Sequence, residues 1–126
     1  MATVRYLVRD VERAAEFYVE QLGFVVEQEM LPAFARIRRD DLTLWLAGPK
    51  SSAARPMPDG SQPEPGGWNR FVIEVDDLTA VVETLGPAGA RFRNDIVTGP
   101  GGRQILVEDP DGNPILITAE DPGAEI

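Results

Sequence analysis

The sequence contains no cysteine and no histidine. Without cysteine, the chain forms no disulfide bond and offers neither a thiolate nucleophile nor a thiolate metal ligand, which fits a reducing compartment. The chain also lacks any run of about 18 to 20 apolar residues, the length that spans a bilayer. Its start, MATVRYLVRD, carries charge where a signal peptide has its apolar segment. We therefore expect a soluble, cytoplasmic protein that makes no contact with a membrane.

Basic side chains are scarce as well. The 126 residues include 12 Lys and Arg against 21 Asp and Glu, which gives a formal net charge of -9. Binding to nucleic acid depends largely on neutralising phosphates, so we expect no nucleic-acid partner. The length suits one hydrophobic core, and we expect residues 1–126 to form a single domain.

The first part of the chain reads as one strand, one helix and three further strands. Residues 3–8 alternate in polarity, and Asp10 can cap a helix in which Val11, Ala14, Ala15, Tyr18 and Leu22 recur at helical spacing until Gly23. Strand-like segments follow at residues 24–30, 33–38 and 42–47. The pattern predicts a βαβββ unit over residues 1–47.

The same order of elements returns after a connecting segment. Residues 48–68 are dense in Pro, Gly and Ser and have no apolar period, which is typical of a linker, although a lid or an interface segment has the same composition. A strand at 70–75, a helix capped by Asp77, and strands at 90–97, 103–108 and 115–118 then give a second unit over residues 69–119. The expected fold class is α+β, with two βαβββ repeats related by a pseudo-twofold.

Three segments carry a resemblance to a known family: VRDVERAAEFYVEQLGF at residues 8–24, EVDDLTAVVETLGPAGARF at 74–92 and GGRQILVEDPDGNPILI at 101–117. They resemble the vicinal oxygen chelate superfamily, which contains glyoxalases, extradiol dioxygenases and bleomycin resistance proteins. The resemblance implies a curved mixed sheet around a cleft of the glyoxalase/bleomycin-resistance type. It also implies a small-molecule ligand and a homodimer. Because one fold carries many chemistries, it does not by itself imply an activity.

The resemblance also implies where a divalent metal would be held in members that use one. Two of these positions lie seven residues before the capping Asp10 and Asp77, and one lies within the last strand of each repeat. They are occupied here by Thr3, Arg70, Trp45 and Leu116. The expected ligands are therefore absent, and we expect no metal and no other cofactor. An all-carboxylate site built from residues such as Glu27, Glu29 and Glu74 is the alternative, and we interpret these side chains as solvated.

Successive side chains of a strand point to opposite faces of the sheet. The more apolar set is expected to pack on the helix, so the residues between them are predicted to face the cleft. Arginine pairs with carboxylate or phosphate and stacks on flat rings, so this face suggests an aromatic ligand with an anionic group. Alternatively, the arginines pair with Glu27, Glu29 and Glu74 and only keep the sheet soluble. The predicted binding residues are Arg5, Phe34, Arg36, Arg38, Trp45, Arg70, Val72, Glu74 and Leu116.

The leading hypothesis is a metal-free protein that sequesters or carries a partly aromatic small molecule. A metal-independent enzyme of the isomerase or lyase type is the alternative, with Glu74 as the base because it is the acidic side chain that alternation places in the cleft. A purely structural or subunit-interface protein is the third class. In each case we expect a twofold homodimer.

Overall fold

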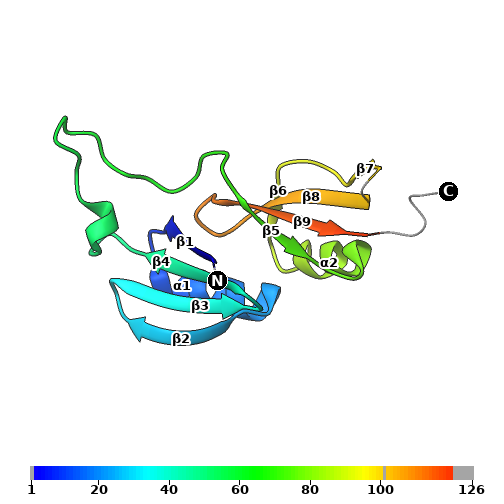
Figure 1. Ribbon diagram of the computed structural model, residues 1–126, viewed down its shortest axis with the longest axis horizontal. Helices are drawn as coiled ribbons and strands as arrows, with labels where there is room; N and C mark the ends of the chain where they lie inside the picture. The colour runs from blue at the N-terminus through cyan, green and yellow to red at the C-terminus, as the bar shows by residue number, and fades with distance from the viewer. Residues whose placement is uncertain (1, 101, 121–126) are drawn as a thin grey trace. The chain divides into compact units, whose positions relative to one another are not determined.

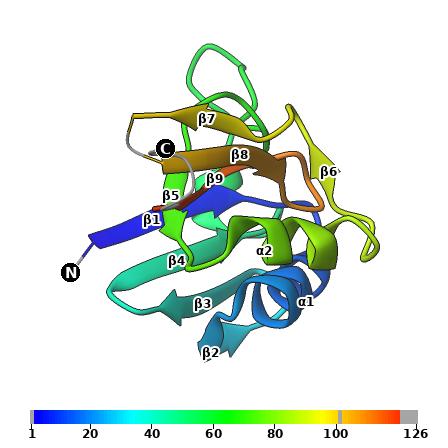
Figure 2. The same cartoon turned by 90° about the vertical axis from the view of Figure 1, so that its right-hand side faces the viewer.

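The computed structural model describes residues 2–100 and 102–120 (Figures 1 and 2). The chain divides into two compact units. The first runs as far as Gly67 and also takes Pro110–Asn113, and the second holds Trp68–Asp109 and the residues from Pro114 onward. Each contains one α-helix and one sheet, as the two predicted repeats require. That residues 1–126 form one domain stays a prediction.

The first unit is a mixed four-stranded sheet with a helix on one face. Its elements are β1 (Ala2–Leu7), α1 (Val11–Leu22), β2 (Val25–Met30), β3 (Phe34–Arg39) and β4 (Leu42–Ala47). The strand order is β1-β4-β3-β2, with β1 parallel to β4 and the other pairs antiparallel. Helix α1 packs against β2, β3 and β4 (Figure 2).

Helix α1 begins and ends where the sequence predicts. Asp10 caps it by accepting a hydrogen bond from the Arg13 amide at 3.1 Å. Gly23 ends it with a φ of 74°, in the left-handed region that glycine adopts without a steric penalty. The predicted apolar stripe is its buried face: Val11, Ala14, Ala15, Tyr18 and Leu22.

The second unit repeats this plan with strands of two to seven residues. Its elements are β5 (Phe71–Glu74), α2 (Leu78–Leu85), β6 (Arg91–Phe92), β7 (Val97–Gly99), β8 (Gly102–Glu108) and β9 (Pro114–Ala119). The order is β5-β9-β8-β6, and β7 also pairs with β8. Asp77 caps α2 through the Ala80 amide at 3.1 Å, and α2 packs against β9. The α+β fold with mixed sheets is as expected.

One predicted strand is wrong. Residues 90–97 do not form one continuous strand, because β6 ends at Phe92 and β7 begins only at Val97. After β6, the Arg93 amide still donates to the Leu106 carbonyl at 2.8 Å, but the Leu106 amide donates to the side-chain Oδ1 of Asn94 at 2.9 Å. Because a side chain takes the acceptor role that a backbone carbonyl has in a ladder, the strand is interrupted at Asn94.

The predicted linker is irregular apart from one short 3₁₀ turn, η1 (Ser52–Ala54), as the segment between β4 and β5 in Figure 1 shows. Ser61 donates from its hydroxyl at 2.7 Å and from its amide at 2.9 Å to Oδ1 of Asp59, which lowers the pKa of Asp59 below its usual value. In the part of the chain that the structure describes, no helix is long and apolar enough to cross a membrane.

Candidate functional site

The open face of the first sheet carries a row of three predicted binding residues. Trp45 on β4 lies in register with Arg5 on β1 and with Arg36 on β3. Residues in register share a face, so these three side chains lie side by side. Their strand neighbours of opposite parity, such as Ile37 and Leu44, are fully buried. The predicted alternation therefore holds along β3, whereas on β4 Thr43 and Ala47, which have the parity of Trp45, are buried.

An aromatic pair occupies the same face. The rings of Phe34 and Trp45 meet edge to face, with centroids 5.5 Å apart and planes at 86°. The indole N–H of Trp45 is buried, and no acceptor for it lies among the described residues. A buried N–H donor usually has an acceptor. The N–H of Trp45 can therefore donate to an acceptor that comes from outside the described residues.

The arginines of this face are partly neutralised. Nε of Arg38 donates to Oε2 of Glu27 at 2.9 Å, and Nε of Arg36 lies 3.7 Å from Oε1 of the same carboxylate. The pairing anticipated from the sequence thus exists for Glu27, whereas neither Glu29 nor Glu74 forms an ion pair within the described residues. Both arginine side chains stay 40% or more exposed, so these pairs are solvent-screened and of small energy.

The second sheet presents the remaining predicted residues on its own open face. Val72 lies in register with Leu116, and Glu74 with Thr118. Phe71 is buried and Val72 is 52% exposed, which confirms the predicted alternation here. Arg70 precedes β5, and its Nη1 donates to the Trp68 carbonyl at 3.1 Å.

Glu74 also lines a cavity of about 490 Å³ in this unit. The other residues that line it are Val75, Asp76, Thr118, Ala119 and Glu120. The lining is acidic and offers little apolar surface to an aromatic ring.

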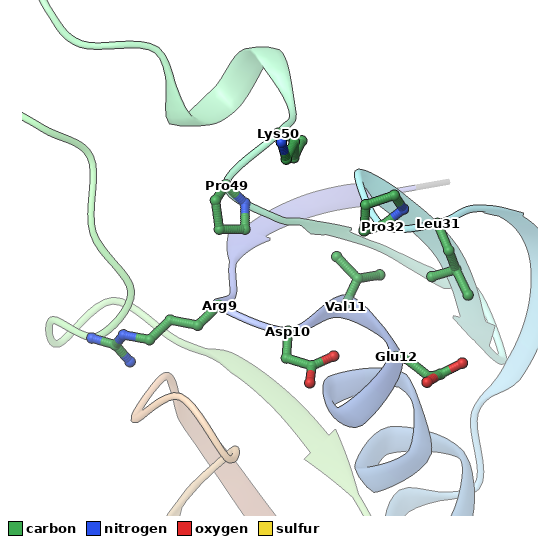
Figure 3. Close-up of a pocket in the computed structure, with 8 residues that line it drawn as sticks. All are labelled: Arg9, Asp10, Val11, Glu12, Leu31, Pro32, Pro49 and Lys50. Atoms are coloured by element: carbon green, nitrogen blue, oxygen red, sulfur yellow. The ribbon is translucent and has the colours of Figure 1, made fainter.

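A different cavity, of about 400 Å³, lies in the first unit at the start of α1 (Figure 3). None of the predicted binding residues lines it. Oδ1 of Asp10 is used as the helix cap, and Arg9 is directed away from Leu31 and Pro32, with its Nη1 3.6 Å from Oδ1 of Asp111. The Asp10 and Arg9 side chains are thus engaged in holding the unit together. The lining residues are Arg9, Asp10, Val11, Glu12, Leu31, Pro32, Pro49 and Lys50.

Sequence reasoning missed a second aromatic site. Trp68, assigned to the linker, is 70% exposed, and its ring lies over the guanidinium of Arg93, whose Cζ is 4.6 Å from the ring centroid. The available signal was a tryptophan at the end of a segment rich in Pro and Gly, two residues before Arg70. Its partner Arg93 could not be read from the sequence, because the contact joins distant parts of the chain.

Comparison with known proteins identifies the family. Residues 1–117 match the model of the Glyoxalase/Bleomycin resistance protein/Dioxygenase superfamily. The chain belongs to this superfamily. CFP32 of Mycobacterium tuberculosis, provisionally named a glyoxylase, is 31% identical over 106 residues, which is 82% of this chain and 39% of that protein. The chain therefore spans about two fifths of the length of this curated relative.

Solved structures of superfamily members show the same fold. A member from Sphaerobacter thermophilus is 28% identical and superposes with a TM-score of 0.75, covering 95% of this chain and 96% of that one. The antibiotic-binding protein TnmS3 from Streptomyces sp. CB03234 is 26% identical with a TM-score of 0.71, covering 94% and 93%. The chain is similar to both, and one of these relatives is a binding protein.

The residues present do not fit the divalent metal that the resemblance noted in the sequence implies for some members. The implied ligand positions hold Thr3, Trp45, Arg70 and Leu116, a set without carboxylate or imidazole. Among residues 2–100 and 102–120, no group of three or more His, Cys, Asp or Glu side chains lies close enough together to hold a metal ion. We assign no chemical step to a metal.

Proposed function

We propose that this chain is a small-molecule-binding protein that works without a metal and sequesters or carries a partly aromatic ligand with an anionic group. The observation that carries the proposal is the row of Arg5, Trp45 and Arg36 on the open face of the first sheet. Trp45 offers a ring edge and face together with an unpaired N–H, and the two guanidinium groups beside it suit a carboxylate, sulfonate or phosphate.

The aromatic part of the ligand follows from the Phe34–Trp45 pair. An edge-to-face pair leaves part of each ring open to a third ring, and aromatic contacts of this kind contribute about 0.5 to 1.5 kcal/mol beyond the area they bury. The likeness to TnmS3, which binds an antibiotic, supports a binding role for the same fold. A shared cleft that also uses Arg70, Val72, Glu74 and Leu116 stays a prediction.

A thermal-shift screen tests the proposal. Aromatic carboxylates and sulfonates should raise the melting temperature, while aromatic amines of the same ring size should not. A ligand present at about 100 times its dissociation constant adds roughly 2.7 kcal/mol to the free energy of unfolding. If only cationic or purely aliphatic compounds stabilise the protein, the proposal is wrong about the ligand class.

A second candidate function is a metal-independent isomerase or lyase with Glu74 as general base. The observation that favours it is the cavity of about 490 Å³ that Glu74 lines with Thr118 and Asp76. Glu74→Gln separates the two functions. An enzyme would lose turnover while still binding its substrate, whereas the binding protein proposed above would show no turnover in either form.

We also propose a twofold homodimer. Strand β2 is one of the two edge strands of the first sheet, and all six of its residues are exposed, including Val25 at 63% and Met30 at 61%. An exposed edge with apolar side chains favours pairing with a second copy, and twofold dimers are the commonest closed assembly.

A further inference from the structure

Trp68 belongs to the second unit, whereas the Phe34–Trp45 pair belongs to the first. It is the most exposed large apolar side chain among the described residues, at 70%. One face of its ring rests on Arg93, whose side chain is only 16% exposed. Nε of Arg93 in turn donates to Oε2 of Glu108 at 2.9 Å. The ring therefore lies on a guanidinium that is itself fixed to β8.

We propose that the Trp68 indole is a ring-stacking surface for a planar aromatic anion, a specificity-determining contact of the second unit. The inference rests on the proposed function, because it names a contact in the second unit for the same chemical class of ligand. A guanidinium on one face of an indole is a favourable cation–π contact, and it leaves the opposite face open to a second flat ring. Because the Arg93–Glu108 pair already orients this support, stacking requires little further ordering of side chains.

The charges around the ring select an anion. Glu108 is shared by Arg93 and Arg91, whose Nε lies 3.6 Å from Oε1 of Glu108 and whose side chain is 74% exposed. Arg70 adds a third guanidinium, held near Trp68 by its bond to the Trp68 carbonyl. The contacts around Trp68 thus bring together three guanidinium groups and one carboxylate, in a chain whose formal net charge is -9. This local excess of positive charge suits a carboxylate, sulfonate or phosphate beside the stacked ring.

Strand β5, which follows Arg70, carries an exposed apolar side chain. Val72 is 52% exposed and lies in register with Leu116, which is itself only partly buried. The second unit thus exposes both an indole and an aliphatic side chain within residues 68–72. The chemical class that fits is therefore a flat, partly apolar ring system bearing one anionic group.

The probe for the test is anilinonaphthalene sulfonate, an aromatic anion, with the neutral phenylnaphthylamine as its uncharged counterpart. Calorimetric titration of wild type, Trp68→Ala and Trp68→Phe gives the affinities. Met57→Ala serves as the matched control, because Met57 is an exposed apolar side chain of the linker at 47%. We expect Trp68→Ala to weaken sulfonate binding about tenfold, or about 1.4 kcal/mol, and Trp68→Phe to retain most of it. Met57→Ala should bind like wild type, and the neutral probe should bind wild type more weakly than the sulfonate.

A second readout locates the contact. The chain has two tryptophans, Trp45 and Trp68, so a nitrogen–proton correlation spectrum shows two indole N–H signals that Trp45→Phe and Trp68→Phe assign. The Trp68 signal should shift with the saturation curve of the probe. Unchanged melting temperatures for the Trp68 variants would show that any loss of affinity is local, as the exposure of Trp68 predicts.

The outcomes separate this inference from the proposed function. If Trp45→Ala weakens binding while Trp68→Ala binds like Met57→Ala, the inference is overturned and the proposed function stands. If Trp68→Ala alone weakens binding, the inference stands and the site on the first sheet is wrong. Binding of the probe that neither substitution alters overturns both. Failure of wild type to bind the sulfonate overturns the inference, while the thermal-shift screen decides the proposed function.

Discussion

Asn113 provides a quantitative test of the fold, because one buried amide ties three segments of the first unit together. It is 3% exposed. Its Nδ2 donates to the Leu7 carbonyl at the end of β1 at 2.7 Å, and its Oδ1 accepts from the Gly66 amide at 2.7 Å. The segment Pro110–Asn113 is thereby bound to β1 and to the end of the linker.

Replacing Asn113 by Ala removes both hydrogen bonds and leaves two backbone groups without these partners. Each bond contributes about 0.5 to 1.5 kcal/mol, and an unsatisfied partner in a partly buried place adds about 1 kcal/mol or more. We expect Asn113→Ala to lower the free energy of unfolding by about 2 to 4 kcal/mol, a large share of the 5 to 15 kcal/mol of a typical domain. Asn113→Asp should be at least as damaging near neutral pH, because a carboxylate cannot donate to the Leu7 carbonyl.

Urea unfolding followed by circular dichroism measures this effect. Asn69→Ala is the matched control, since Asn69 is an exposed amide in the described part of the chain and has no hydrogen bond there. The reasoning is refuted if Asn113→Ala unfolds within about 0.5 kcal/mol of Asn69→Ala, the range of ordinary surface substitutions.

Three further predictions concern metal, packing and assembly. Elemental analysis after dialysis should find no stoichiometric zinc, nickel, iron or manganese, and near one equivalent of any of these would contradict the assignment of Thr3, Trp45, Arg70 and Leu116 as non-ligands. Gly48→Ala should destabilise the protein by about 1 to 3 kcal/mol, because a Cβ there would lie 2.8 Å from Cγ2 of Val11, while Gly99→Ala, which meets nothing within 4 Å, should be close to neutral. Light scattering should report a dimer, and a 13.8 kDa species at working concentration would exclude it.

The elements that depend on local chemistry could be predicted from the sequence. Asp10 and Asp77 as helix caps, Gly23 as the end of α1, and the alternation that buries Phe71 but exposes Val72 each depend on a few neighbouring residues. The register of Arg5, Trp45 and Arg36 follows from the same alternation once the strand order is known.

Features that depend on distant residues could not be predicted. The interruption after β6 requires knowing that Asn94 meets Leu106, and the stacking of Trp68 requires knowing that Arg93 passes beneath it. The Asn113 side chain reaches Leu7 across 106 positions of sequence. Likewise, the sequence left open which carboxylate the arginines would meet, and the fold brings Glu27 to both Arg36 and Arg38.

The central claim, that the open face of the first sheet binds an aromatic anion, is tested most directly by calorimetric titration of the best aromatic anion from the thermal-shift screen. Trp45→Ala should weaken its binding about tenfold or more, because it removes a ring contact and an N–H donor that together contribute on the order of 1 to 3 kcal/mol. Arg55→Ala, which changes an exposed charge in the linker, should not alter it. Unchanged affinity in Trp45→Ala, with the ligand still bound in a one-to-one ratio, would contradict the claim.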